Sequence, residues 1–202
     1  MMKSVYPPNL GWVEQKLKPE AMKFLWDIID IGGTSLRSKL AGNINSSYKL
    51  IDKNDWFFKK VVTPTIKFYA DEFHDPLYNF PMKRRVKYCL ADIWVNYQKQ
   101  TEFNPIHTHT GIFSFVIWMK IPTKFEDQKK LPIADGVNSR AISSFEIGYQ
   151  NILGESLSHI YNMDPAYEGT MLLFPSKLSH AVYPFYKCDE DRISISGNIM
   201  VE

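Results

Sequence analysis

Two histidines stand two residues apart in NPIHTHTGIFSFVIWMK, residues 104–120, just before one of the most apolar runs of the chain. In an extended strand side chains alternate between two faces, so His107 and His109 would point the same way, about 6 to 7 Å apart along the backbone. One metal ion could bind both imidazoles. This pair is the first candidate for chemistry in the sequence.

A third histidine, His180, ends the apolar segment GTMLLFPSKLSH, which turns at Pro175 and Ser176. With His107 and His109 it would give three neutral nitrogen donors, a set that suits iron, zinc, copper or nickel better than magnesium or calcium. A lone histidine is more often a surface residue or a hydrogen-bonded core residue than a ligand. We interpret His74 and His159 in that way.

The C-terminal segment RISISGNIM alternates between polar and apolar residues, as a strand with one buried face does. One face would carry Arg192, Ser194, Ser196 and Asn198, and the other Ile193, Ile195 and Ile199. In an ordinary strand the polar face meets water. Here Arg192 follows His180 by only twelve residues, which favours a place for this polar face in the same site.

Several other chemistries lack their sequence motifs. No G-x-S-x-G nucleophile elbow, phosphate-binding glycine loop, CxxC pair or HExxH helix is present. Cys89 and Cys188 have no cationic setting evident from the sequence, and two cysteines are too few for a disulfide framework. The sequence therefore favours a reducing compartment and a histidine metal site.

Helical patterns come first along the chain. Apolar residues at helical spacing follow Pro19 and stop at Gly32 and Gly33, and a second helix is predicted over residues 54–73, capped by Asn54 or Asp55. Pro64 indicates a kink or a late start in that helix.

Strand patterns fill the rest, over residues 86–98, 111–121, 142–150, 157–162, 169–175, 180–186 and 191–201. Strands without intervening helices predict a mainly β sandwich or barrel. We expect one domain, with residues 1–80 as helical support and residues 86–202 as the core. The polar segment 123–141 is predicted to be a long surface loop that could serve as a lid.

The charge pattern gives little reason to expect nucleic acid as a partner. The 202 residues carry a formal net charge of +2, spread along the chain, and the short run Lys83-Arg84-Arg85 is typical of a solvated turn. No apolar stretch approaches the ~20 residues that cross a bilayer. We expect a cytoplasmic protein that does not use a membrane.

The order of these motifs resembles the 2-oxoglutarate and Fe(II)-dependent oxygenases, most closely a branch common in bacteriophage genomes. The similarity covers about residues 86–200. Its motifs are W-x-N, H-x-H, I-P, LFPS-x-L-x-H-x-V-x-P and R-I-S-x-S-x-N, which here are Trp94 and Asn96, His107 and His109, Ile121 and Pro122, residues 173–184, and Arg192, Ser194, Ser196 and Asn198.

The resemblance implies a double-stranded β-helix, or jelly roll, with the N-terminal helices packed on it and with Fe(II) and 2-oxoglutarate as cofactors. It implies His107 and the distal His180 as iron ligands, Arg192 and Ser194 as partners of the remote carboxylate of 2-oxoglutarate, and Asn96 as a further contact. The implied reaction couples decarboxylation of 2-oxoglutarate, to succinate and CO₂, with hydroxylation of a small-molecule or peptidyl substrate.

His109 departs from the family pattern, because it stands where the family usually has Asp or Glu. Three imidazoles would leave the full charge of the metal to be balanced by the bound ligand. We therefore hypothesise that metal binding depends more on the dianion 2-oxoglutarate than in relatives with a carboxylate. Asp92 and Glu146 are the other candidates for the missing acid.

Two other functions fit the same residues. One is a metal-binding cupin that does not use 2-oxoglutarate, although such sites usually add a Glu three to five residues after H-x-H, where Ile112, Phe113 and Ser114 stand here. The other is a catalytically inactive structural jelly roll. Loops carry substrate contacts in such scaffolds, so we expect specificity to come from residues 123–141 and from Phe80 to Arg85.

Overall fold

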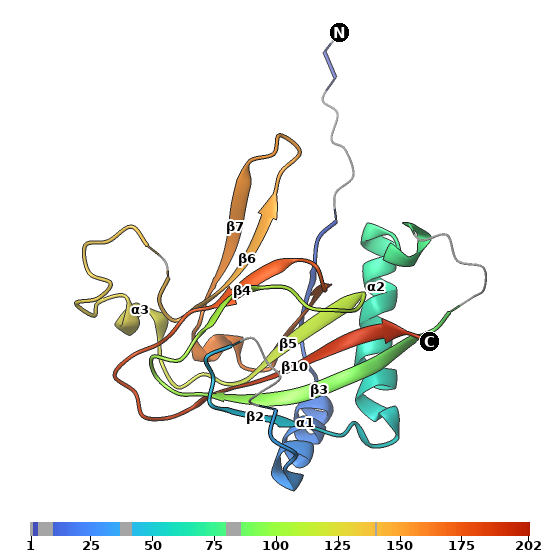
Figure 1. The fold of residues 1–202 in the computed structure, drawn as a ribbon, viewed down its shortest axis with the longest axis horizontal. Helices are drawn as coiled ribbons and strands as arrows, with labels where there is room; N and C mark the ends of the chain where they lie inside the picture. Colours follow the sequence, from blue (N-terminus) through green and yellow to red (C-terminus); the bar gives the residue numbers. More distant parts are fainter. Residues whose placement is uncertain (1, 4–9, 37–41, 80–85, 140) are drawn as a thin grey trace.

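Two antiparallel sheets face one another in the fold (Figure 1). The computed structural model describes residues 2–3, 10–36, 42–79, 86–139 and 141–202. The six-stranded sheet has the order β1-β8-β5-β10-β3-β2, formed by Val13–Lys16, Thr170–Pro175, Phe113–Lys120, Arg192–Val201, Tyr88–Gln98 and Ser46–Lys49. The four-stranded sheet has the order β4-β9-β6-β7, formed by Asn104–His107, Ser179–Val182, Ser144–Gln150 and Ser156–Asn162.

The seven strands predicted from the sequence are all present, as β3 and β5 to β10, and the mainly β, two-sheet architecture is confirmed. Three strands escape the sequence patterns: β1, β2 and β4 are four residues each and read VEQK, SSYK and NPIH. Segments so short and polar carry no readable alternation. They become strands because neighbouring strands in the sheets offer them backbone hydrogen bonds.

Helix α1, Pro19–Ile31, matches its prediction, with Pro19 in the first turn and Gly32 (φ 78°) ending it. Helix α2, Thr63–Phe73, starts late, as Pro64 indicated, and follows a π-helical turn at Phe58–Val62. Shorter helices are η1 (Lys53–Asp55), η3 (Pro76–Asn79), α3 (Phe125–Gln128) and η4 (Pro165–Tyr167).

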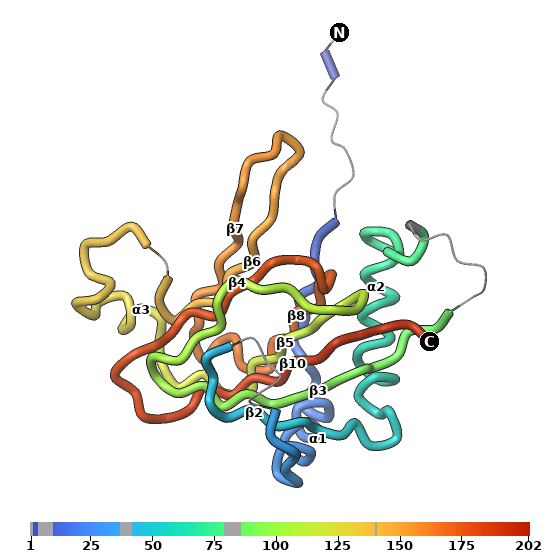
Figure 2. The backbone as a smooth tube through the Cα atoms, in the orientation of Figure 1, coloured from blue at the N-terminus to red at the C-terminus, as the bar shows by residue number. Residues whose placement is uncertain are grey.

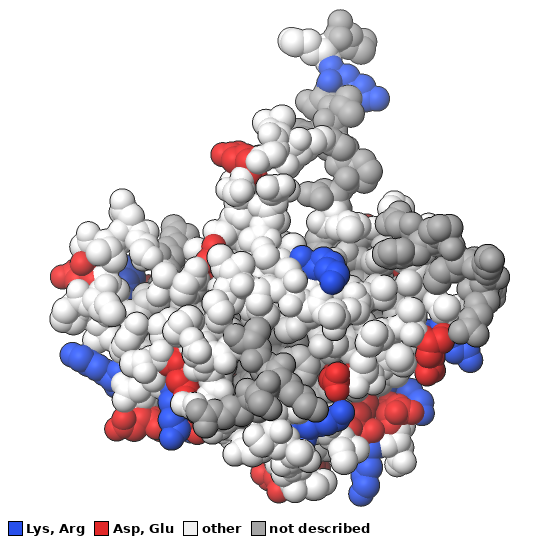
Figure 3. All heavy atoms as spheres, viewed as in Figure 1, with Lys and Arg blue, Asp and Glu red and all other residues white. Residues whose placement is uncertain are grey.

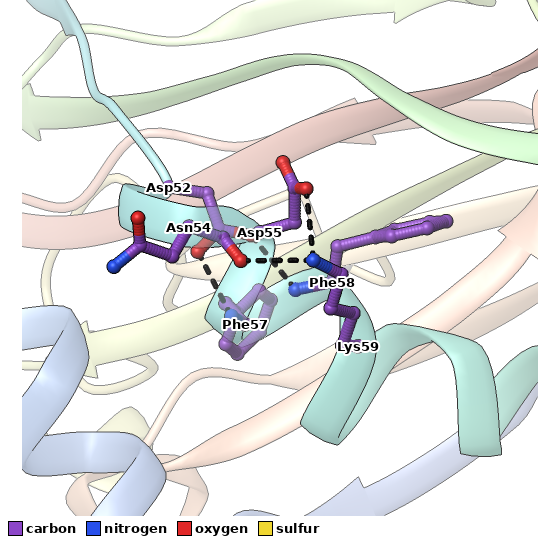
Figure 4. A network of polar contacts seen from close by, with 6 residues as sticks. All are labelled: Asp52, Asn54, Asp55, Phe57, Phe58 and Lys59. Carbon is purple, nitrogen blue, oxygen red and sulfur yellow. Dashed lines mark hydrogen bonds and ion pairs between the residues drawn. The ribbon is translucent and has the colours of Figure 1, made fainter.

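The predicted cap of the second helix was wrong. Asn54 and Asp55 both have positive φ, and the carboxylate of Asp52 accepts the backbone N–H groups of Phe57 and Phe58, each at 2.8 Å (Figure 4). A cap can sit before an irregular turn because its side chain needs only to reach the first free N–H groups.

The two faces of the six-stranded sheet have different roles (Figure 1; Figure 2). One face packs against α1 and α2 in the larger apolar core, which includes Leu25, Tyr69, Val95, Phe115 and Ile195. The other face looks toward the four-stranded sheet, where a smaller cluster around Trp118, Phe145 and Phe174 fills part of the space. The rest of that space is a cavity lined by both polar and aromatic side chains.

The segment 123–141 is less loop-like than predicted. It contains the short helix α3, and the buried Gln128 donates to the Tyr186 carbonyl at 2.9 Å and accepts from the Tyr186 N–H at 2.8 Å. This double hydrogen bond fixes the start of the segment to the chain before β10. Phe80 to Arg85, the other region where we expect specificity, lies outside the described residues.

Charge is mixed on the face shown in Figure 3, where acidic and basic side chains alternate along the lower edge. Within the described ranges, no helix is both long enough and apolar enough to span a membrane. The run Lys83-Arg84-Arg85 falls among the residues without a described placement.

Candidate metal and cosubstrate site

Strand pairing brings the three candidate histidines together. His107, at the end of β4, lies opposite His180 of β9 in the sheet register, and His109 follows two residues beyond the end of β4. The possible ligand atoms of the three rings all lie within 4.8 Å of one another, and Nε2 of His109 is 3.1 Å from Nε2 of His180. Imidazole nitrogens at such distances can share one metal ion.

Backbone carbonyls orient two of the rings. Nδ1 of His107 lies 2.7 Å from the Pro105 carbonyl, and Nδ1 of His180 lies 3.0 Å from the Leu178 carbonyl. A carbonyl only accepts, so each Nδ1 carries the proton and each Nε2 presents its lone pair. His109 is held by its backbone instead, because its N–H donates to the Ser176 carbonyl at 2.8 Å.

Burial keeps the rings of His109 and His180 neutral. It lowers the pKa of His180 to about 3 and that of His109 to about 4, with a smaller contribution from the nearby His107 ring. Aromatic side chains surround the two rings. The Trp94 and His109 ring centroids are 6.0 Å apart in an edge-to-face arrangement, and those of Phe174 and His180 are 4.9 Å apart. Neutral imidazoles are the form that binds metals.

Arg192 lies in the same cavity with part of its hydrogen-bonding capacity unused. Its side chain is only 3% exposed, and Nη2 donates to the Tyr183 carbonyl at 2.8 Å. Nε and Nη1 are buried without a hydrogen-bond partner, and the guanidinium lies over the Phe185 ring, 4.9 Å from its centroid. Burial lowers the pKa of Arg192 to about 9, which leaves it cationic at neutral pH. A carboxylate that accepts from Nη1 or from Nε would give this buried cation the partner it lacks.

All six predicted site residues line one cavity of about 480 Å³: Asn96, His107, His109, His180, Arg192 and Ser194. Ser194 of β10 pairs in register with Asn96 of β3, so the two lie side by side on the cavity face of the sheet. The Asn96 side-chain oxygen accepts from the Ser47 hydroxyl at 2.7 Å. That contact leaves the amide nitrogen of Asn96 as the donor toward a ligand.

Neither candidate acid joins the histidines. The Glu146 carboxylate accepts from the Tyr183 hydroxyl at 2.5 Å. Ile147 is the residue opposite His180 in the sheet, so the adjacent Glu146 lies on the other face of the strand. Asp92 does line the cavity, but its carboxylate pairs with Lys49 Nζ at 3.1 Å. In the part of the chain that the structure describes, the donor set is three imidazoles.

The remaining histidines are not in the cluster. His74 follows the last turn of α2, and His159 of β7 packs its ring on Trp12 and Tyr161. Sequence reasoning missed the contribution of Ser47 and Lys49, which line the cavity from β2. Only an alternation of polar and apolar residues in β2 could have revealed them, and a strand of four residues is too short to show one.

Residues 92–198 match the family described as "Putative 2OG-Fe(II) oxygenase", and this match spans more than half of the chain. The chain belongs to this family. No curated protein shows significant sequence similarity to this 2OG-Fe(II) oxygenase family member.

Solved structures share its fold at low sequence identity. An oxidoreductase of the 2OG-Fe(II) oxygenase family from Burkholderia pseudomallei has 15% identity and a TM-score of 0.52, over 94% of this chain and 84% of that one. A Pseudomonas putida prolyl-4-hydroxylase has 12% identity and a TM-score of 0.55, over 95% of this chain and 92% of that one. A viral collagen prolyl hydroxylase from Paramecium bursaria Chlorella virus-1, in complex with 2OG, has 12% identity and a TM-score of 0.50, over 93% of this chain and 94% of that one.

The cofactors that this family implies fit the residues present. Three neutral imidazoles suit Fe(II), and the unpaired donors of a buried guanidinium suit one carboxylate of 2-oxoglutarate. Both features are local properties of this chain, independent of the family match.

Proposed function

We propose that the protein is an Fe(II)- and 2-oxoglutarate-dependent dioxygenase that hydroxylates a small-molecule or peptidyl substrate. One observation carries the proposal: Arg192 holds two buried, unpartnered donors in the same cavity as three clustered histidines. A metal site alone has no use for a buried guanidinium, whereas a dicarboxylate that also binds the metal needs one at its far end.

Each residue then has a defined role. His107, His109 and His180 hold Fe(II) through neutral nitrogens, and Arg192 with Ser194 binds the remote carboxylate of 2-oxoglutarate. Asn96 donates its amide hydrogen to the cosubstrate. When bound, the two groups supply oxidative decarboxylation to succinate and CO₂ together with oxidation of a substrate C–H bond. Trp94, Phe145 and Phe174 exclude water from the centre.

The proposal is tested by anaerobic titration of the full chain with Fe(II) and 2-oxoglutarate. We expect a weak visible charge-transfer band that needs both components, and slow succinate formation once oxygen is admitted. At 2-oxoglutarate concentrations that just saturate the wild type, the variant Arg192→Met should bind Fe(II) yet show almost none of the band or of the succinate. A metal signal indifferent to 2-oxoglutarate would instead support a cupin, and no binding of either would support a structural jelly roll.

We also propose that the protein belongs to the bacteriophage branch of the family and that it acts in the cytoplasm.

A further inference from the structure

The cavity extends farther than 2-oxoglutarate can reach. Strand β10 lines it with Arg192, Ser194, Ser196 and Asn198, and the first lies six residue steps from the last, about 20 Å along the strand. The two carboxyl carbons of 2-oxoglutarate lie at most about 5 Å apart, since four C–C bonds join them. One end of the cavity therefore stays open for another molecule.

The sheet register orders the contents of the cavity. Arg192 lies opposite Gln98, Ser194 opposite Asn96, Ser196 opposite Trp94 and Asn198 opposite Asp92. Trp94 contacts the His109 ring, so the histidines lie near the level of Ser196. The end that carries Asn198 and Asp92 is beyond the metal centre as seen from Arg192.

This far end carries a pair of opposite charges. Lys49 of β2, opposite Trp94 in the register, places Nζ 3.1 Å from a carboxylate oxygen of Asp92. Both side chains line the cavity and are about half exposed, at 49% and 51%. The nearby Asn198 accepts from the Ser114 hydroxyl at 2.8 Å, which leaves its amide nitrogen as a donor.

Backbone features fix the positions of these two residues. The β3–β10 register shifts after Asp92, so Ala91 is an extra residue on β3, and such a bulge redirects the neighbouring side chain. On β2, the Lys49 N–H donates to the Thr34 carbonyl at 2.8 Å. Gly33 approaches the Lys49 carbonyl so closely that a Cβ would lie 1.7 Å from its oxygen. The pair stands on backbone with little freedom to shift.

We propose that this end of the cavity binds the substrate and that the substrate is a zwitterion, a free α-amino acid. Its carboxylate pairs with Lys49 and accepts from Asn198, while its ammonium group pairs with Asp92. The inference rests on the proposed function, because it names the substrate class of that oxygenase.

Charge explains the selectivity. A half-exposed ion pair adds little to stability, so a ligand can separate Lys49 from Asp92 at little cost. A zwitterion gives each of them a new partner in a less hydrated place, whereas an anion or a cation leaves one of them unpaired. Nucleic acid and phosphate esters are disfavoured by Asp92, and an internal peptide residue lacks both charges.

The test measures binding of the twenty free L-amino acids to the full chain by calorimetry, both metal-free and loaded anaerobically with Fe(II) and 2-oxoglutarate. At least one amino acid should bind at least ten times more tightly than its N-acetylated or amidated form. Lys49→Met and Asp92→Asn should each weaken that binding at least tenfold. Lys23→Met, which breaks the 2.7 Å pair with Asp27 on α1, is the matched control and should leave amino-acid binding unchanged.

A charge swap, Lys49→Asp with Asp92→Lys, separates recognition from stability. The swapped chain keeps an attractive cross-strand pair, so its melting temperature should match that of the wild type, while amino-acid binding should be lost. Blocked amino acids that bind as well as free ones, or a swapped chain that binds normally, would overturn the inference.

The same samples distinguish the two proposals. Amino-acid binding that depends on Lys49 and Asp92, in a chain that ignores 2-oxoglutarate, supports the zwitterion site and removes the oxygenase assignment. Binding of 2-oxoglutarate through Arg192, with no amino acid bound, does the reverse.

Discussion

At the scale of single residues, Arg192 is the least satisfied group in the cavity. Its guanidinium is buried, with one hydrogen bond and two donors unused. An uncompensated buried charge destabilises a fold, so it persists where a ligand supplies the missing partner. Arg192 therefore links ligand binding to stability.

Arg192→Met should raise the Kd for 2-oxoglutarate by about 100-fold, because charge-assisted hydrogen bonds are lost. The ligand-free variant should melt at the same temperature as the wild type or higher, since the unpaired charge is gone. Calorimetry and thermal melting measure the two effects. Arg192→Lys is the control and should recover only part of the affinity, because an ammonium group cannot form the fork. Unchanged affinity in Arg192→Met would show that the cosubstrate binds elsewhere.

His109→Asp should uncouple the metal from the cosubstrate. In the wild type, three neutral ligands leave the charge of Fe(II) to be balanced by 2-oxoglutarate, so Fe(II) should bind at least tenfold more tightly when 2-oxoglutarate is present. A carboxylate at position 109 supplies part of that charge, and the enhancement should shrink. Anaerobic Fe(II) titrations with and without 2-oxoglutarate measure it. Equal wild-type affinities in both titrations contradict the hypothesis.

The metal-free protein should lose stability as the pH falls below 6.5. The pKa of His109 is about 4 and that of His180 about 3 in the fold, below the ordinary value of 6.5. The unfolded chain therefore binds more protons between these values, so the free energy of unfolding decreases with falling pH, by on the order of 2 kcal/mol per histidine at pH 5. Urea unfolding at pH 7 and pH 5 measures the loss. His109→Gln should remove about half of this loss, because His180 remains, and a flat wild-type profile would contradict the burial of neutral rings.

At the scale of elements, the sequence was most informative where strands are long. The alternation in β10 correctly separated Arg192 and Ser194 from Ile193 and Ile195, because each face of a strand has one environment. His107 and His109 do come together as predicted, but not through strand alternation, since β4 ends at His107 and the turn after it brings His109 to the site. Short strands such as β2 are created by their partners, so Lys49 could not be placed beforehand.

The start of the helical segment before α2 offers a test of local structure. Asp52→Ala should lower the free energy of unfolding by about 1–2 kcal/mol, because the Phe57 and Phe58 N–H groups lose their acceptor. Asp55→Asn, which removes only an exposed ion pair with Lys59 and keeps a residue type that tolerates its positive φ, is the control and should change stability by at most about 0.5 kcal/mol. Equal losses in the two variants would contradict the capping role of Asp52.

At the scale of the whole molecule, the N-terminal third is built into the core. Strands β1 and β2 extend the six-stranded sheet on both edges, and α1 and α2 cover its apolar face. Phe57 and Tyr69 are fully buried there and contact Phe115 and Phe113. We therefore propose that the chain is one folding unit.

A fragment of residues 86–202 should fail to fold, because it exposes the face that α1 and α2 cover and lacks two strands. The full chain should unfold in one cooperative transition, with the same midpoint by circular dichroism and by tryptophan fluorescence. A fragment that unfolds cooperatively and binds Fe(II) with 2-oxoglutarate would show instead that the N-terminal third is dispensable.

The alternation of β10, and of β3 from Asp92 onward, gives the fold a capacity for change. Positions 92, 194, 196 and 198 line the cavity, whereas Ile93 and Ile195 belong to the apolar core under α1 and α2. A library randomised at those four positions would sample new ligand preferences with the hydrophobic interior intact. Strands of this kind let one scaffold diversify its chemistry while its thermodynamics stay nearly constant.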